Sequence, residues 1–252
     1  MIKFEKTETM GWEGAIRGMR NPMNSWDKSD SGNCYDFDSC DACPLVEPCK
    51  KTDCTQTYVI GPNDLDLARR LAKGGPVHAK YRRQIFVSVD ITAPLYWWKE
   101  FDTYKVGTTA NSCSTMHKIH AEPFKLEQFS HEHLVSVDDN DGFTLPNAIG
   151  DEEEWDDKTV LSLTIIALNH YRNLYLQTKD KRYWYKLIQL LPSSYNQKRT
   201  VTMTYENLYN AFQSRKDHKL DEWRVGFCEW AKSLPYSELF TMEWEETNEQ
   251  TS

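Results

Sequence analysis

A cluster of cysteines provides the most obvious set of metal ligands in the sequence. Five cysteines lie within residues 34–54, and Cys40 and Cys43 form a CxxC pair. With Cys49 and Cys54 they could supply the four soft ligands of a tetrahedral structural zinc site. The surrounding segment is too polar to fold on apolar burial alone, which favours a bound metal. Reduced thiols in a cytoplasmic loop are an equally simple interpretation, and an iron–sulfur cluster is a third.

Histidines form two further pairs whose spacing occurs in metal sites. His117 and His120 have HxxH spacing, and His131 and His133 have HxH spacing. Either pair could bind a metal, but no glutamate lies between His117 and His120 as it does in hydrolytic zinc sites. For His120, His131 and His133, ordinary polar or partly buried histidines are the preferred interpretation.

Motifs for nucleophilic catalysis and for phosphate loops are missing from the sequence. It contains no GxSxG, no P-loop and no GxGxxG, and Cys113 lies in no recognisable nucleophile context. The common hydrolase and dinucleotide-fold interpretations are therefore set aside.

The composition argues against binding to duplex nucleic acid. The chain of 252 residues has 30 basic and 38 acidic residues, a net charge of -8, whereas proteins that follow a phosphate backbone usually have a basic face. A single nucleotide remains possible, because one phosphate needs few cations. The polar start of the sequence and the absence of an apolar run near ~20 residues predict a cytoplasmic protein without a membrane partner.

The elements that position these residues follow from the spacing of apolar side chains. Residues 22–63 lack periodicity, and we expect a Cys-rich insert or small subdomain within a single domain of residues 1–252. The pattern predicts strands at 2–5 and 84–91, helices at 9–20, 63–73, 94–104, 156–178, 181–191, 204–215 and 218–234, and a polar loop at 107–114.

Two stretches of the sequence match the motifs of one protein family in order. In the first, Gly-Pro-Val-His at residues 75–78 precedes the predicted strand, Pro94 begins a helix, and residues 109–117 contain Asn111 and Ser114 in an Asn-x-x-Ser pattern. In the second, Leu-Pro at residues 191–192 precedes residues 208–215, which contain Asn-x-Phe-x-x-Arg.

The second stretch continues to residues 217–224, which end in Glu-Trp-Arg. In this order the two stretches resemble the central and C-terminal motifs of flavin-dependent thymidylate synthases. The resemblance covers about 160 residues by eye. It implies an α/β (α+β) fold in which helices cover a central mixed sheet, with sites at the subunit interfaces of a homotetramer.

The resemblance also implies an activity. Family members use reduced FAD to carry a one-carbon unit from methylenetetrahydrofolate onto dUMP and then reduce it, with NADPH as hydride donor; the flavin supplies the chemistry and the protein supplies orientation and charge. The residues that would contact the nucleotide are Ser114, Arg215, Asn111 and Glu100. The residues that would contact the flavin are His78, Lys105, Asn210, Glu222 and Arg224.

Several positions depart from the family pattern. The family's Arg-His-Arg triplet is replaced by Thr103-Tyr104-Lys105, and Glu206 stands where a flavin-contacting arginine is expected. Loss of arginine forks weakens phosphate binding, and a glutamate repels phosphate. Two alternatives therefore remain open: a flavin enzyme acting on another pyrimidine nucleotide, and a non-catalytic nucleotide-binding or interaction protein. Singly, the matched residues could also be turn residues or helix-face pairs.

Overall fold

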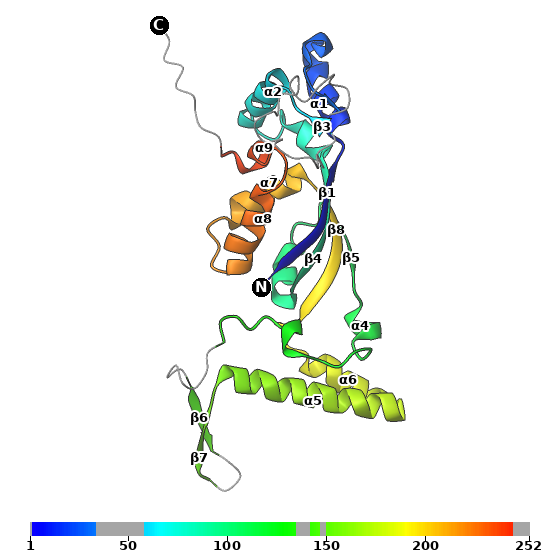
Figure 1. The fold of residues 1–252 in the computed structure, drawn as a ribbon, viewed down its shortest axis with the longest axis vertical. Coiled ribbons are helices and arrows are strands. Elements are labelled where there is room, and N and C mark those ends of the chain that lie inside the picture. The colour runs from blue at the N-terminus through cyan, green and yellow to red at the C-terminus, as the bar shows by residue number, and fades with distance from the viewer. Residues whose placement is uncertain (1, 34–57, 135–141, 147–149, 244–252) are drawn as a thin grey trace, which may run out of the picture. The chain divides into compact units, whose positions relative to one another are not determined.

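The computed structural model describes residues 2–33, 58–134, 142–146 and 150–243 (Figure 1). The chain divides into two compact units. Unit 1 comprises Met1–Lys3, Ile91–Thr103 and Asn111–Thr200, and unit 2 comprises Phe4–Asp90, Tyr104–Ala110 and Val201–Ser252.

A four-stranded sheet with the order β1-β4-β8-β5 contributes residues to both units. Its strands are β1 (Lys3–Met10), β4 (Phe86–Pro94), β8 (Asn196–Thr204) and β5 (Thr109–Ser112). Buried and less buried side chains alternate along β4, with Val87, Val89 and Ile91 buried. This is the period of two that places alternate side chains on one face.

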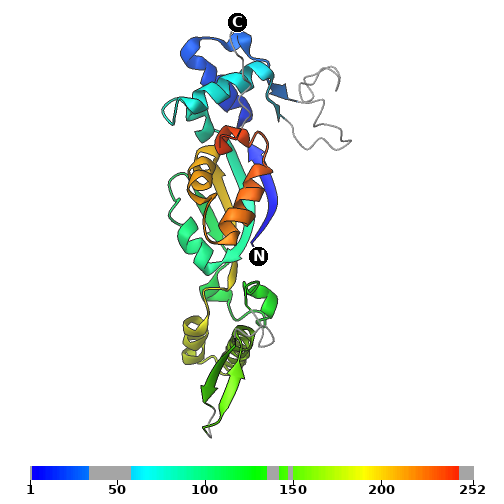
Figure 2. The same ribbon diagram turned by 90° about the vertical axis from the view of Figure 1, so that its left-hand side faces the viewer.

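Unit 2 contains helices that lie on one face of its part of the sheet: α7 and α8 lie to the left of the strands in Figure 1 and in front of them in Figure 2. Phe4 of β1 stacks on Trp230 of α8 with ring centroids 4.4 Å apart. The elements of unit 2 besides its strands in the sheet are α1 (Trp12–Arg20), η1 (Asn21–Met23), η2 (Trp26–Lys28), β2 (Gly32–Asn33), β3 (Tyr58–Val59), α2 (Pro62–Lys73), η5 (Lys80–Arg83), α7 (Tyr205–Arg215), the π-helix η8 (Glu222–Phe227), α8 (Cys228–Lys232) and α9 (Glu238–Thr241).

Helix α1 begins one residue after a glycine that no other residue could replace without strain. Gly11 has φ of 89°, and a Cβ there would lie 2.1 Å from the backbone oxygen of Gln84. Glycine adopts this left-handed conformation without steric cost. The helix then buries Trp12, Ile16 and Met19 in the core of unit 2, where Trp12 meets Tyr205 edge-on at 5.2 Å.

Unit 1 is built around the long helix α5 (Asp157–Thr178) and the next helix in the chain, α6 (Lys181–Leu190). The two helices pack against each other. Their buried residues Leu161, Leu168 and Leu187 form one cluster with Phe124 and Phe129. The remaining elements of unit 1 are α3 (Leu95–Phe101), α4 (Thr115–Lys118), η6 (Leu126–Gln128), β6 (Phe143–Pro146) and β7 (Glu152–Trp155), of which β6 and β7 pair antiparallel.

The prediction of an α/β fold with a sheet and covering helices is confirmed, and most predicted helices are present. Residues 109–112 were expected to be loop but form strand β5, because they are neighbours of β8 in the sheet. Strand β8 itself was not predicted. Its sequence NQKRTVTMT is polar through most of its length, and only Gln197, Val201, Met203 and Thr204 are buried.

Two helix boundaries also differ from expectation. The first strand extends to Met10, so α1 begins at Trp12 rather than near residue 9. The helix predicted at 218–234 starts as the π-helix η8, and apolar spacing alone does not reveal this widened turn. Within the described ranges, no helix is long and apolar enough to cross a membrane.

Candidate functional site

Arg215 lies at the end of α7 in unit 2, in contact with two aromatic rings. Its Nε donates a hydrogen bond of 3.0 Å to the Tyr104 hydroxyl. Its guanidinium carbon lies 5.0 Å from the centre of the Trp223 ring and 5.7 Å from that of Tyr104. Stacking on aromatic faces orients a guanidinium while leaving its charge intact. The three side chains therefore form a positioned cation, here called the Arg215 cluster.

The π-helix η8 provides the Trp223 wall of this cluster. Trp223 is fully buried and packs against Phe227 at 5.2 Å and His218 at 6.5 Å. A π-turn widens the helix by one residue and often occurs at functional sites. The sequence signal for Trp223 was its place in the Glu-Trp-Arg motif, but its contact with Arg215 depends on the tertiary fold.

A short segment of unit 2, Tyr104–Ala110, carries Tyr104 and Lys105 and is tied to the start of α7. The Asn207 side chain donates a hydrogen bond of 2.5 Å to the Val106 carbonyl. Gly107 has φ of 80°, and a Cβ there would lie 3.1 Å from the Asn207 Oδ1 atom. Asn207 thus fixes the segment that positions Lys105, which is exposed.

Asn207 was not singled out in the sequence, although a local signal was present. Thr204 and Asn207 form a capping box at the start of α7, in which the Thr204 backbone N–H donates to Asn207 Oδ1 over 3.0 Å. A Thr-x-x-Asn pattern before an apolar helix is a recognisable N-terminal signature.

Glu206, the charge reversal noted in the sequence, lies in the first turn of α7. One carboxylate oxygen is 3.7 Å from the Arg83 guanidinium. The other, Oε2, is buried and has no hydrogen-bond partner in the part of the chain that the structure describes. A buried carboxylate oxygen requires a donor, so this position fits a hydroxyl or N–H group of a ligand better than a phosphate.

Asn111 and Ser114 lie in unit 1, at and just after β5. The Ser114 hydroxyl accepts a 2.9 Å hydrogen bond from the His117 N–H and so caps α4. The segment is held on β8: the Cys113 N–H donates to the Lys198 carbonyl over 2.9 Å. Asn111 is exposed.

Arg199 supports the Asn111–Ser114 segment, and no motif in the sequence indicated this role. Its Nε donates to Gln197 Oε1 over 2.9 Å, and the Gln197 amide donates to the Cys113 carbonyl over 2.9 Å. Arg199 also bonds Asp102 at 2.8 Å and lies over the Trp98 ring at 4.1 Å. A charged fork in a polar strand has no distinguishing local pattern.

The other predicted contacts divide between the two units. Glu100 lies on α3 in unit 1 and is half-buried, while the predicted flavin contacts are all in unit 2. His78 and Asn210 are exposed, and Glu222 is buried at the start of η8. Arg224 is half exposed and pairs with Asp221 three residues away at 2.6 Å. The Arg224 contact is therefore a local helix-face pair.

The predicted zinc ligands Cys40, Cys43, Cys49 and Cys54 lie outside the described residues. The described residues hold no cluster of three or more His, Cys, Asp or Glu that could bind a metal ion. The His120 ring packs edge-on against Tyr175 at 4.9 Å. His131 Nδ1 lies 2.8 Å from the Phe129 carbonyl.

The two described cysteines occupy different environments. Cys113 is exposed, and Cys228 is buried. Burial is the largest cause that raises the pKa of Cys228 to about 11, so its thiol is protonated at neutral pH and is a poor nucleophile.

The fold of this chain is that of the flavin-dependent thymidylate synthases. The flavin-dependent thymidylate synthase ThyX of Helicobacter pylori, solved with FAD and dUMP, is similar at a TM-score of 0.58 with 15% sequence identity, over 96% of this chain and 97% of that one. A second structure of ThyX from the same organism, also with FAD and dUMP, gives a TM-score of 0.57 and 14% identity over 96% of both chains. No protein-family model matches the sequence, and no curated protein matches it.

Proposed function

We propose that this protein is a flavin-dependent thymidylate synthase-like enzyme that methylates dUMP reductively, with methylenetetrahydrofolate as carbon donor, reduced FAD and NADPH. The observation that supports this most directly is the likeness in fold to a protein solved with FAD and dUMP, which extends over nearly the whole chain. The Arg215 cluster agrees with it, because the arginine at the motif position is held by aromatic side chains.

In this proposal Arg215 contacts the phosphate or the base of the nucleotide. A planar guanidinium matches phosphate oxygens better than an ammonium does, because it can bond two of them at once. The aromatic contacts reduce the entropy lost when the side chain is fixed by a ligand. Ser114, Asn111 and Glu100 would supply the other contacts to the nucleotide, and the Arg199 bonds would keep the Asn111–Ser114 segment in place.

The residues around the Tyr104–Ala110 segment fit a flavin nucleotide in part. Lys105 offers an exposed ammonium for an anionic group, and the unpartnered Glu206 oxygen offers an acceptor for a hydroxyl or N–H. His78, Asn210, Glu222 and Arg224 are the further proposed contacts. Bound FAD would supply the transfer of the one-carbon unit and the hydride chemistry; the chain would bind and orient the nucleotide.

The second candidate is a flavin enzyme of the same fold that acts on another pyrimidine nucleotide. Glu206 favours it, because a mostly buried carboxylate at an expected arginine position changes which ligand groups can bind there. A non-catalytic nucleotide-binding or interaction protein is the third candidate, and it would retain the Arg215 cluster without flavin turnover.

Flavin content and nucleotide binding separate these candidates. The purified protein, after incubation with FAD, should be yellow and should bind dUMP in a calorimetric titration. Arg215→Ala should weaken dUMP binding by about tenfold or more, the loss expected for one charge-assisted hydrogen bond. Arg215→Lys should recover only part of the affinity.

Arg182→Ala is the matched control, because Arg182 is exposed and pairs only locally with Asp180 at 2.6 Å. A colourless protein that binds dUMP but not FAD would support the non-catalytic candidate. Tight binding of another pyrimidine nucleotide with weak dUMP binding would support the second. Undiminished dUMP affinity in Arg215→Ala would remove Arg215 from the site.

Structural zinc at Cys40, Cys43, Cys49 and Cys54 remains part of the proposal, as do a homotetramer and a cytoplasmic location. Four thiolates in one short segment would bind zinc and help to order a polar chain. We expect the purified protein to contain about one zinc per chain and Cys40→Ser with Cys43→Ser to lose it, as measured by elemental analysis. Equal zinc content in both proteins would contradict this prediction.

A further inference from the structure

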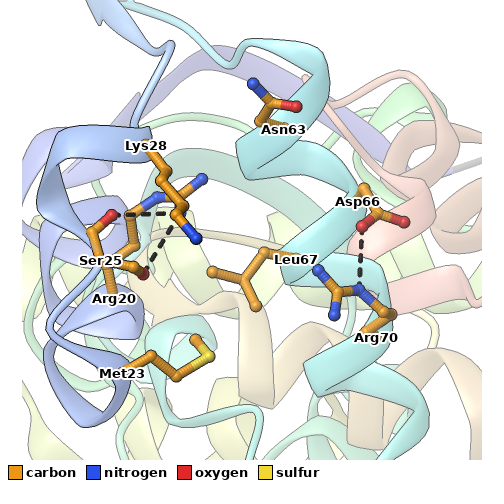
Figure 3. Close-up of a pocket in the computed structure, with 8 residues that line it drawn as sticks. All are labelled: Arg20, Met23, Ser25, Lys28, Asn63, Asp66, Leu67 and Arg70. Carbon is orange, nitrogen blue, oxygen red and sulfur yellow. Dashed lines mark hydrogen bonds and ion pairs between the residues drawn. The ribbon is translucent and has the colours of Figure 1, made fainter.

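A cavity in unit 2 is lined by none of the residues proposed to bind dUMP or FAD. It has a volume of about 490 Å³ and is formed by residues at the end of α1, in η1 and η2, and along α2 (Figure 3). This size is in the range of cavities that bind small organic molecules. Its lining combines cationic side chains with an apolar surface, and these two features define what it can bind.

The back of the cavity contains a buried arginine whose charge is compensated. Arg20 is 4% exposed, and its Nε lies 2.5 Å from Asp64 Oδ1. Its Nη1 donates to the Ser25 carbonyl and hydroxyl over 3.3 and 3.4 Å. Because Asp64 is fully buried and ionised, the pair adds a rigid guanidinium to the wall but no net charge.

The mouth of the cavity carries an uncompensated positive charge. Figure 3 shows Lys28 and Arg70 reaching toward the space from opposite walls, with Leu67 between them. Arg70 is paired with Asp66 at 2.9 Å. The Lys28 ammonium has no ion-pair partner among the residues that the structure describes. In a protein of net charge -8, this local excess of positive charge favours an anion.

The floor of the cavity is apolar. Leu67 is nearly fully buried at 4% exposure and Met23 is 49% exposed, and both line the space. Apolar surface of this kind is stabilised when a ligand covers it, and the flexible Met23 side chain can adapt to the shape of a ligand. An inorganic ion alone would leave this surface uncovered.

We propose that this cavity binds a small organic anion, with its phosphate or carboxylate head between Lys28 and Arg70 and its apolar body against Met23 and Leu67. The site is distinct from the proposed nucleotide site, since none of the predicted contact residues lines it. It would therefore serve an effector or second ligand, and it does not depend on the enzymatic proposal.

Calorimetric titrations of the full chain with four probes test the site: phenyl phosphate, benzoate, inorganic phosphate and neutral benzyl alcohol. Phenyl phosphate or benzoate, or both, should bind more tightly than inorganic phosphate and benzyl alcohol, and the better of the two identifies the head group. Each titration is repeated in the Arg215→Ala chain, so that binding at the proposed nucleotide site is not counted.

Variants locate the binding. Lys28→Ala and Arg70→Gln should each weaken it by about tenfold, the effect of one charge-assisted contact, and Met23→Ser should weaken the aromatic probes more than inorganic phosphate. The controls are Lys80→Ala, an exposed lysine outside the cavity, and Arg17→Gln. Arg17 is 67% exposed like Arg70 and pairs with Glu13 at the same spacing, but it does not line the cavity.

The proposal fails if no probe binds in the millimolar range, or if benzyl alcohol binds as tightly as the anions. It also fails if Lys28→Ala and Arg70→Gln behave like Lys80→Ala and Arg17→Gln. If dUMP binds but no probe binds in the cavity, the cavity proposal is wrong. If the probes bind in the cavity but dUMP does not bind, the proposed nucleotide site is wrong.

Discussion

Asp64 is a single buried carboxylate whose ion pair and hydrogen bonds stabilise the N-terminal part of unit 2. It is fully buried, pairs with Arg20, and accepts hydrogen bonds from the hydroxyls of Ser29 and Ser31 at 2.7 and 2.6 Å. Burial alone would raise the pKa of Asp64, but the hydrogen bonds from Ser31, Ser29 and Arg20 together with the Arg20 charge outweigh it and lower the pKa. The carboxylate is therefore held in its charged form.

Replacing Asp64 should be strongly destabilising because it leaves a buried arginine without its partner. Asp64→Ala should lower the free energy of unfolding by about 3–5 kcal/mol. Asp66→Ala should cost no more than about 0.5 kcal/mol, since the Asp66–Arg70 pair is exposed. Urea denaturation of both variants measures the difference. Similar losses of unfolding free energy in the two variants would mean that burial of the Arg20–Asp64 pair contributes little to stability.

Helix α7 is hydrogen-bonded to the Tyr104–Ala110 segment near both of its ends. Its first turn carries Asn207, which bonds the Val106 carbonyl, and its last residue is Arg215, which bonds Tyr104. Both bonds reach the Tyr104–Ala110 segment. A rigid helix of 11 residues thus holds this segment at two points.

Removing the Asn207 side chain should loosen the segment as well as the helix cap. Asn207→Ala should reduce stability by about 1 kcal/mol and increase amide hydrogen exchange in residues 104–110. Asp156→Ala is the control, because it removes the cap of α5 in unit 1, where Asp156 accepts from the Thr159 N–H. If exchange in residues 104–110 changes equally in both variants, Asn207 does not hold the segment.

Among the described residues, folding lowers the pKa values of His120 in unit 1 and Asp64 in unit 2, and also that of the exposed Asp180 beside Arg182. Burial, followed by Lys179, Lys118 and Arg172, lowers the pKa of His120 in unit 1 from its usual 6.5. The pKa of Asp64 in unit 2 is lowered from its usual 3.8. In both cases the unfolded chain binds a proton at a pH where the folded chain does not, so stability increases with pH across each window.

We therefore expect stability to decrease in two steps as the pH falls. The His120 contribution is complete above its unfolded pKa of 6.5 and is lost as the pH falls through its lower folded pKa. The Asp64 contribution is lost below 3.8 in the same way. Thermal unfolding across this range should show a smaller first step in His120→Gln and a smaller second step in Asp64→Asn.

His117→Gln, at an exposed position, is the matched control variant. If the first loss of stability on lowering the pH is the same in His120→Gln and in the unmodified protein, His120 does not cause that step.

Much of the fold could be predicted because it follows from local patterns of apolar and polar residues. Alternation predicted β4, and helical spacing predicted α1, α2, α5, α6 and α7. The order of motifs indicated the family fold. Each of these signals lies within a few residues along the chain, where steric limits and the burial of one face act.

Strand pairing and the contacts between distant side chains depend on the tertiary structure and could not be predicted from local patterns. Strand β8 forms because it pairs with β4 and β5, and β5 forms because it pairs with β8, although each is polar or exposed along much of its length. Arg215 was predicted from a motif, but its partner Tyr104 is 111 residues away in sequence. Likewise Asp64 is buried by a segment more than 30 residues before it. Such contacts depend on how distant segments meet, which local spacing cannot specify.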